Sequence, residues 1–137
     1  MKHLPSFARI GGTAAVAIGL ALVTGVGTAH AEGNTVDYFS SGGKERAMVI
    51  FEPRNSSGGP EIVTVDDRSK DGHYIYAEVY DATSGGKKGT CETSSYKACE
   101  VNVKDGHKVR INVYRLNSRD SDFMGEVHTR AGKLPTA

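Results

Sequence analysis

The chain has 137 residues, with 17 basic and 16 acidic side chains and a formal net charge of +1 at pH 7. This length suits one small domain. The balanced charge argues against the uncompensated basic stripe that nucleic-acid-binding proteins carry, so no nucleic-acid partner is expected.

The first 31 residues have the pattern of a secretory leader. Lys2 and Arg9 form a basic start, an apolar run rich in alanine, glycine and valine follows, and Ala29-His30-Ala31 matches a signal peptidase site. The run is too broken by glycine to serve as a membrane span, which needs about 20 apolar residues. We therefore expect cleavage after Ala31, a secreted, extracellular protein without membrane attachment, and one domain over residues 32–137.

Beyond the leader, apolar and polar residues alternate with a period of two, which is typical of β-strands. Apolar stripes at helical spacing are absent from this part of the sequence. Seven strands are predicted, at residues 35–39, 46–51, 61–65, 73–81, 99–103, 108–116 and 123–129. Short strands spaced about ten residues apart predict an all-β fold, a single small antiparallel β-sandwich of about seven strands with one disulfide.

Two of these runs give specific predictions about burial. Residues 46–51 form a compact apolar run, which predicts a strand buried on both faces. In residues 123–129, strict alternation puts Phe123 and Val127 on one face of the strand and Met124 on the other.

The dipeptides Asp71-Gly72 and Asp105-Gly106 each separate two alternating runs. Asp-Gly is a strong signal for a two-residue hairpin turn in which both central residues have positive φ, so we predict a hairpin at each position. A histidine follows each turn, and Asp71 with His73, or Asp105 with His107, could bind a cation or exchange a proton. Aspartate at a turn more simply bonds to nearby backbone, so we predict neither a metal nor a cofactor.

Cys91 and Cys99 are the two cysteines of the chain. In an exported protein two cysteines normally pair. The segment between them contains no histidine, and the spacing is not the Cys-x-x-Cys of metal and redox sites. We therefore predict a structural disulfide that closes a stapled loop over residues 91–99.

Tyrosines gather on the polar side of two predicted strands. Tyr74, Tyr76 and Tyr80 share one face of the strand 73–81, and Arg110 and Tyr114 take the matching face of the strand 108–116. Tyrosine combines a rigid apolar ring with a polar tip, which suits contact with protein or sugar surfaces. The competing interpretation is that these side chains only stabilise the sheet through cross-strand pairs.

The stapled loop supports a second hypothesis. A nine-residue disulfide ring resembles, in size, the reactive loop of Bowman–Birk protease inhibitors. The resemblance implies that Thr93 is the specificity residue, followed by Ser94, with Tyr96 in the same loop. The prolines of that family are absent here.

Most of the chain after the leader resembles the small secreted β-rich proteins of actinobacteria. The segments that carry this resemblance are Val63-Thr64-Val65-Asp66-Asp67, Asp71-Gly72-His73, Gly89-Thr90-Cys91 and Val103-Lys104-Asp105-Gly106-His107. The resemblance implies export and a β fold, and it implies no activity.

Enzyme motifs such as Gly-x-Ser-x-Gly and His-Glu-x-x-His are absent from the sequence, so we predict no catalytic residues and no enzyme activity. The sequence predicts an extracellular interaction module that binds an unknown extracellular protein or polysaccharide through the tyrosine face. The alternative is an inhibitor of a secreted hydrolase, such as a protease, that acts through the loop 91–99.

Overall fold

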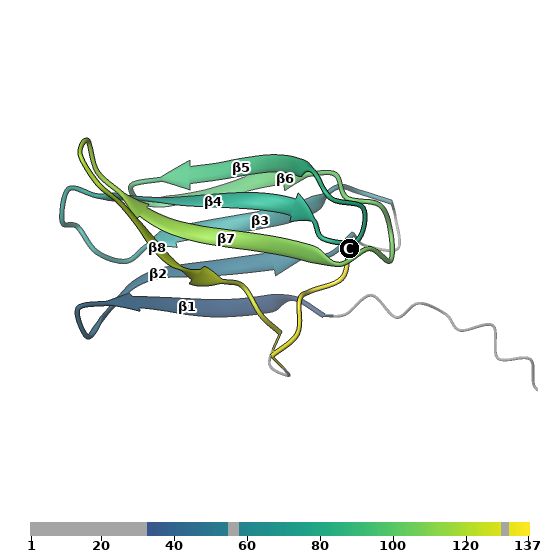
Figure 1. Cartoon of the computed structure of the whole chain (residues 1–137), viewed down its shortest axis with the longest axis horizontal. Helices are drawn as coiled ribbons and strands as arrows, with labels where there is room; N and C mark the ends of the chain where they lie inside the picture. The colour runs from purple at the N-terminus through teal and green to yellow at the C-terminus, as the bar shows by residue number, and fades with distance from the viewer. Residues whose placement is uncertain (1–32, 55–57, 130–131) are drawn as a thin grey trace, which may run out of the picture.

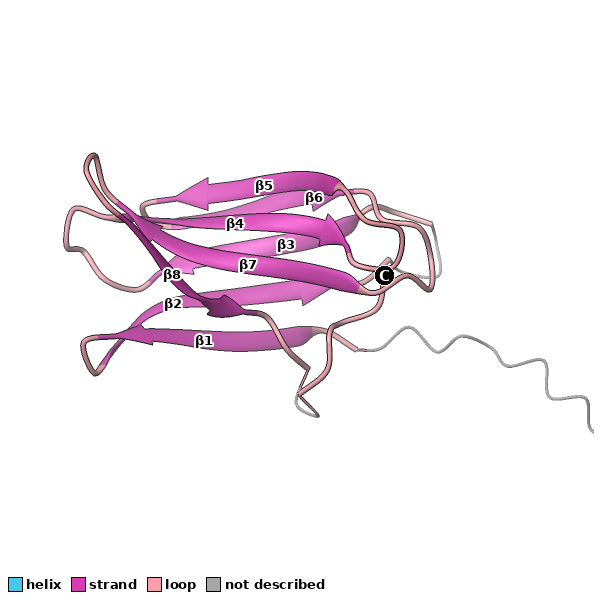
Figure 2. Cartoon of the chain, viewed as in Figure 1, coloured by secondary structure: helices cyan, strands magenta, loops and turns pink. Residues whose placement is uncertain are grey.

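A computed structural model describes residues 33–54, 58–129 and 132–137. The predicted leader and its cleavage site lie outside these residues. The described chain folds as an all-β sandwich of two four-stranded antiparallel sheets, and none of its residues forms a helix (Figures 1 and 2). The predicted fold class is confirmed.

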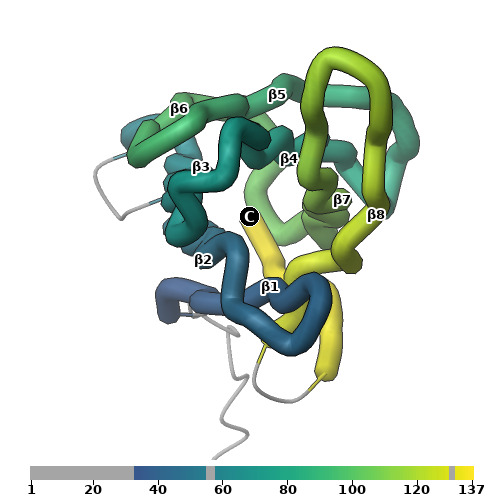
Figure 3. The backbone as a smooth tube through the Cα atoms, turned by 90° about the vertical axis from the view of Figure 1, so that its left-hand side faces the viewer, coloured from purple at the N-terminus to yellow at the C-terminus, as the bar shows by residue number. Residues whose placement is uncertain are grey.

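The structure has eight strands. Their bounds are β1 Thr35–Ser41, β2 Lys44–Glu52, β3 Glu61–Asp67, β4 Tyr74–Asp81, β5 Lys87–Thr93, β6 Tyr96–Val101, β7 Val109–Leu116 and β8 Ser121–Glu126. The first sheet has the order β1-β2-β3-β6 and the second sheet the order β5-β4-β7-β8. The tube in Figure 3, viewed along the strands, shows the two layers with the chain crossing between them at both ends.

The core lies between the two sheets and follows the alternation of the sequence. The first sheet sends Val49, Phe51, Val63 and Val65 inward, and the second sheet sends Ile75, Ala77, Val79, Val109, Ile111 and Val113 inward; all of them are fully buried. Burying a valine or isoleucine side chain contributes roughly 1.5–3 kcal/mol, so this double row supplies most of the drive to fold.

The prediction that residues 46–51 are buried on both faces is wrong. Ala47, Val49 and Phe51 are fully buried, but Met48 and Ile50 are only partly buried because they point away from the core. Strand β2 therefore has an apolar side chain on each face, although no described segment forms a layer over its outer side.

Strand β5 was not predicted, and together with β6 it leaves only a two-residue connection between the two sheets where a loop over 91–99 was expected. Its sequence, which begins with Lys87 and Lys88, has no alternation of apolar residues that would predict a strand. Cys91 is its one buried side chain. Strand β5 forms because β4 pairs with it along its whole length at the edge of the second sheet.

The two Asp-Gly turns are not hairpins. Asp71-Gly72 connects β3 to β4, and Asp105-Gly106 connects β6 to β7, so each carries the chain from one sheet to the other. Only the glycines have positive φ, 79° at Gly72 and 78° at Gly106, whereas the predicted turn requires positive φ at both central residues.

A β-bulge in β8 overturns the predicted faces of residues 123–129. Tyr114 of β7 pairs with Phe123 and Val113 pairs with Gly125, so Met124 is the extra residue. Because a bulge shifts the side-chain alternation by one, Phe123 turns outward while Met124 packs against the core together with the buried Val127.

Both open sides of the sandwich carry a link between the two sheets. On one side, the disulfide Cys91–Cys99 joins β5 to β6, the edge strands of opposite sheets, as predicted. On the other side, Asp37 of the edge strand β1 accepts hydrogen bonds from the backbone N–H of Tyr38 (2.9 Å) and of His128 (3.1 Å). An inward-pointing carboxylate on an edge strand opposes pairing with another chain.

Candidate functional site

The outer face of the second sheet carries the five residues of the candidate binding face. In the register of β4 and β7, Tyr76 lies opposite Tyr114 and Tyr80 lies opposite Arg110, while Tyr74 lies opposite Leu116. The side chains on the other face of these strands form the core, so all five of these residues point to the solvent side of the sheet.

Phe123 extends this face, and sequence reasoning missed it. The ring centroids of Tyr76 and Tyr114 are 6.1 Å apart, and those of Tyr114 and Phe123 are 5.3 Å apart. The three rings form one row across β4, β7 and β8, which we call the aromatic face. Phe123 is 60% exposed, so the row ends in a large apolar side chain in contact with water.

The rings are inclined to one another instead of forming a flat platform. The planes of Tyr76 and Tyr114 make an angle of 46°, and those of Tyr114 and Phe123 an angle of 57°. Tilted and edge-to-face contacts of this kind are favourable between aromatic quadrupoles and hold the rings in place. The arrangement is therefore a preorganised, uneven apolar surface.

Glu78 fixes the tyrosines next to it. Its carboxylate accepts hydrogen bonds from the hydroxyls of Tyr76 (3.3 Å) and Tyr80 (3.0 Å) and from Lys87 Nζ (2.6 Å). The hydrogen bond from Lys87 lowers the pKa of Glu78, and the same bond raises the pKa of Lys87. The hydrogen bond to Glu78 also raises the pKa of Tyr80, so this tyrosine stays neutral.

Two shallow hollows lie beside tyrosines of β4, and the first of them adjoins the aromatic face. One, of ≈ 190 Å³, is lined by Tyr76, Glu78, Tyr114, Leu116 and Ser121. The other, of ≈ 250 Å³, is lined by Tyr74, Glu92, Thr93 and Ser94. The second hollow brings together Tyr74 of the candidate binding face and Thr93 and Ser94 of the candidate inhibitory loop.

The candidate inhibitory loop is a tight strand–turn–strand unit. Thr93 ends β5 and Tyr96 begins β6, so only Ser94 and Ser95 lie outside the strands. The carbonyl of Ser95 accepts a hydrogen bond of 2.6 Å from the backbone N–H of Asp67, which holds the tip against the end of β3. Tyr96 is 64% exposed on the outer face of the first sheet, away from Tyr74.

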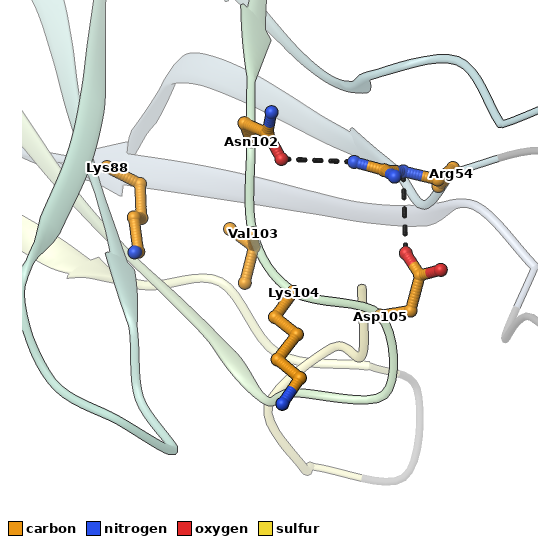
Figure 4. A pocket seen from close by; sticks show the side chains of 6 residues that line it. All are labelled: Arg54, Lys88, Asn102, Val103, Lys104 and Asp105. Atoms are coloured by element: carbon orange, nitrogen blue, oxygen red, sulfur yellow. Dashed lines mark hydrogen bonds and ion pairs between the residues drawn. The ribbon is translucent and has the colours of Figure 1, made fainter.

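A larger hollow, of ≈ 520 Å³, lies at one end of the sandwich (Figure 4). It is lined by Arg54, Lys88, Asn102, Val103, Lys104 and Asp105. Arg54 donates to the side-chain carbonyl of Asn102 (3.0 Å) and forms an ion pair with Asp105 (3.4 Å). Arg54 Nε also lies 3.4 Å from a carboxylate oxygen of the fully buried Glu61. The other carboxylate oxygen of Glu61 accepts a hydrogen bond from the backbone N–H of Val103. Arg54 is thus already engaged, and the cluster fastens the β6–β7 connection to the first sheet.

The two histidines that follow the Asp-Gly turns have different partners. His73 Nδ1 lies 2.9 Å from Asp71, as the sequence allowed, but His107 Nδ1 lies 2.8 Å from Asp81 of β4 and not next to Asp105. These pairs sit near opposite ends of β4, and no group of three metal-ligating side chains occurs among the described residues.

Both aspartates bind several hydrogen-bond donors. Partial burial raises the pKa of Asp71, but hydrogen bonds from Arg115, from the backbone N–H of His73 and from Ser69 outweigh it and hold this pKa well below its usual range. Hydrogen bonds from the hydroxyl and the backbone N–H of Ser84 do the same for Asp81. Both carboxylates are ionised, and their hydrogen bonds hold the connection between β3 and β4 and the turn that follows β4 in place. This role is structural.

The fold and the site together define a small disulfide-stapled β-sandwich with an aromatic outer face. Comparison with known proteins finds no matching family model, no similar curated protein and no similar solved structure.

Proposed function

We propose that this chain is a small secreted, non-enzymatic module that binds an extracellular partner through the aromatic face. The observation that carries the proposal is the continuous row of Tyr76, Tyr114 and Phe123 on the solvent side of a rigid sheet. Aromatic residues and arginine are enriched in the positions that dominate binding energy. Arg110 is on the same face of β7 but lies opposite Tyr80, one pair beyond Glu78–Asn112, and its guanidinium pairs with Glu126 (3.1 Å). The disulfide is compatible with an extracellular location.

The geometry favours a protein over a polysaccharide as the partner. A sugar ring stacks best on a flat aromatic surface, whereas these rings are inclined by 46° and 57°. An uneven apolar surface with polar hydroxyls at its margin suits interdigitating side chains of a protein. The alternative, a hydrolase inhibitor acting through residues 91–99, receives less support because only Ser94 and Ser95 lie outside strands there.

The test compares two single tyrosine variants on opposite faces. The secreted protein is immobilised and exposed separately to extracellular proteins and to isolated cell-wall polysaccharide, and the affinity for any captured partner is measured by calorimetry. Tyr114→Ala should weaken binding about thirtyfold, since loss of an aromatic anchor costs about 2 kcal/mol. Tyr96→Ala, on the other face, should leave the affinity unchanged.

Three results would contradict this proposal. Selective capture of polysaccharide would replace the protein partner with a glycan. A loss of affinity in Tyr96→Ala and in Thr93→Ala, with Tyr114→Ala unaffected, would move the site to the stapled segment 91–99 and favour the inhibitor hypothesis. Failure of both ligand pools to bind would remove the support for an interaction module.

A further inference from the structure

The outer face of the first sheet is also apolar, and its chemistry differs from that of the aromatic face. Three cross-strand rows cover it, which the register gives as Tyr38–Met48–Asp66–Tyr96, Val36–Ile50–Thr64–Ala98 and Glu52–Ile62–Glu100. We call this surface the aliphatic face. Val36 is 44% exposed and Tyr38 52% exposed, and the middle row has no charged side chain.

The two ends of the aliphatic face differ in charge. Glu52 and Glu100 make no ion pair within the part of the chain that the structure describes. At the opposite end, Arg68 follows β3, and its guanidinium lies 5.8 Å from the centre of the Tyr38 ring and 2.9 Å from Glu45. Arg68 Nε also lies 3.9 Å from Asp66. The sheet therefore has an acidic end, an apolar middle and an end where Arg68 is paired with Glu45 and Asp66.

We infer that the aliphatic face binds a second copy of this chain in a two-fold symmetric dimer. The two-fold axis lies in the plane of the face and runs across the strands, between the row of Met48 and the row of Ile50. Rotation about this axis brings the acidic end of one copy onto the Arg68 end of the other. Isologous contacts of this kind are the commonest way in which identical chains associate.

This axis matches the side chains of the two copies in size and polarity. The register places Tyr38 over Val36 of the second copy and Tyr96 over Ala98, so each large side chain meets a small one. Met48 meets Ile50, and Asp66 lies over the position of Thr64, whose side chain is only 3% exposed between its neighbours. The apolar middle has the composition of a homodimer interface, which is more apolar than interfaces between transient partners.

The size of the face predicts a weak dimer. Four strands about 4.8 Å apart and three rows about 6.8 Å apart cover roughly 400 Å² on each copy, or about 800 Å² in total. Stable interfaces bury about 1,200–2,000 Å², so the predicted contact is smaller than these and belongs with weak, reversible associations. We expect a dissociation constant of about 10–100 μM, which is a reversible equilibrium within reach of sedimentation.

The test is sedimentation equilibrium of the secreted protein from about 10 μM to 1 mM, the range that brackets this dissociation constant. Wild type should show a monomer–dimer equilibrium. Ile50→Lys puts two ammonium groups into the apolar middle and should raise the dissociation constant more than a hundredfold. Asn112→Lys, an identical charge on the outer face of the second sheet, should not change it. Thermal unfolding of each variant verifies that it is folded.

A charge exchange makes the test independent of the lysine variant. Glu52→Arg and Arg68→Glu should each weaken the dimer, and the double variant should restore it. The axis places β2 over β2, so Glu52 of one copy meets the end of the other copy where Arg68 lies beside Tyr38 and Glu45. A wild-type chain that stays monomeric at 1 mM, a dimer unaffected by Ile50→Lys, or singles that the double does not restore would each overturn the inference. The result does not depend on the aromatic face or its partner.

Discussion

Removal of the disulfide by Cys91→Ser with Cys99→Ser should destabilise the sandwich by about 2.6 kcal/mol. The cysteines are separated by 8 positions and close a ring of nine residues. Closing a ring of that size lowers the entropy of the unfolded chain by about 8.7 cal/mol/K in the loop-closure model, which is the source of the value at 25 °C. For a domain of about 100 residues, the melting temperature should fall by roughly 10–20 °C.

The position of the bond predicts where the loss appears first. Cys91 is buried at the edge of the second sheet and Cys99 lies at the edge of the first, so the bond holds two edge strands together across the core. Without it, β5 and β6 should open more often than β2 and β7, which are central strands. Local opening would also expose strand edges that pair with other chains.

Denaturant unfolding measures the free energy, and amide hydrogen exchange measures the local opening. Wild-type protein treated with a reductant is the matched control, since it lacks the bond but keeps both side chains. A loss below about 0.5 kcal/mol in both samples would refute the ring-closure reasoning. Equal acceleration of exchange in all eight strands would refute the assignment of the staple to the sheet edges.

Two further predictions concern single residues. Asp71→Asn should lower the melting temperature at neutral pH. The pKa of Asp71 in the folded protein lies below its unfolded value of about 3.9. The difference in melting temperature from wild type should therefore be full above about pH 5 and shrink as the pH falls toward 2. A difference that does not change with pH would contradict the assigned ionisation. Gly125→Ala should cost about 1–3 kcal/mol in denaturant unfolding, because Gly125 has a φ of 146° and an added Cβ would lie 3.1 Å from the Phe39 ring. Gly33→Ala, which meets nothing within 4 Å, should be neutral and serves as its control.

The period of two in the sequence was sufficient to predict the fold class and most of the core. The alternation that put Tyr74, Tyr76 and Tyr80 on one face of their strand leaves Ile75, Ala77 and Val79 on the other face, and these three are fully buried, as are Ile111 and Val113. Alternation works here because every inward position of a sandwich contacts the other sheet, so burial and parity coincide.

Parity fails where the register shifts. The extra residue Met124 in β8 depends on pairing with β7, and a pairing partner distant along the chain leaves no local mark in the sequence. Phe123, the most exposed ring of the aromatic face, was therefore assigned to the wrong side. A further signal was present, since a glycine at position 125 inside a strand is itself a sign of a bulge.

Two other features were outside the reach of local patterns. Strand β5 is held by its pairing with β4, and its lysines gave no apolar alternation to detect. The apolar outer side of β2 was interpreted as burial, because Met48 and Ile50 have the composition of core residues wherever they point. Composition predicts that a side chain avoids water, and it does not identify the surface that covers it.

Three of the four edge strands are restrained, which favours association through the faces. Strand addition needs an accessible edge, but β5 and β6 are joined by the disulfide, and Asp37 binds the backbone N–H of Tyr38 on β1. Apolar side chains remain on both outer faces, aliphatic on one and aromatic on the other. If two copies join through their aliphatic faces, their aromatic faces point in opposite directions, and each dimer presents two equivalent sites. Linked sites raise the apparent affinity only when both can be occupied by the same target, and two sites that face opposite ways cannot both rest on one surface. The dimer should therefore bridge two separate partner molecules, one on each side.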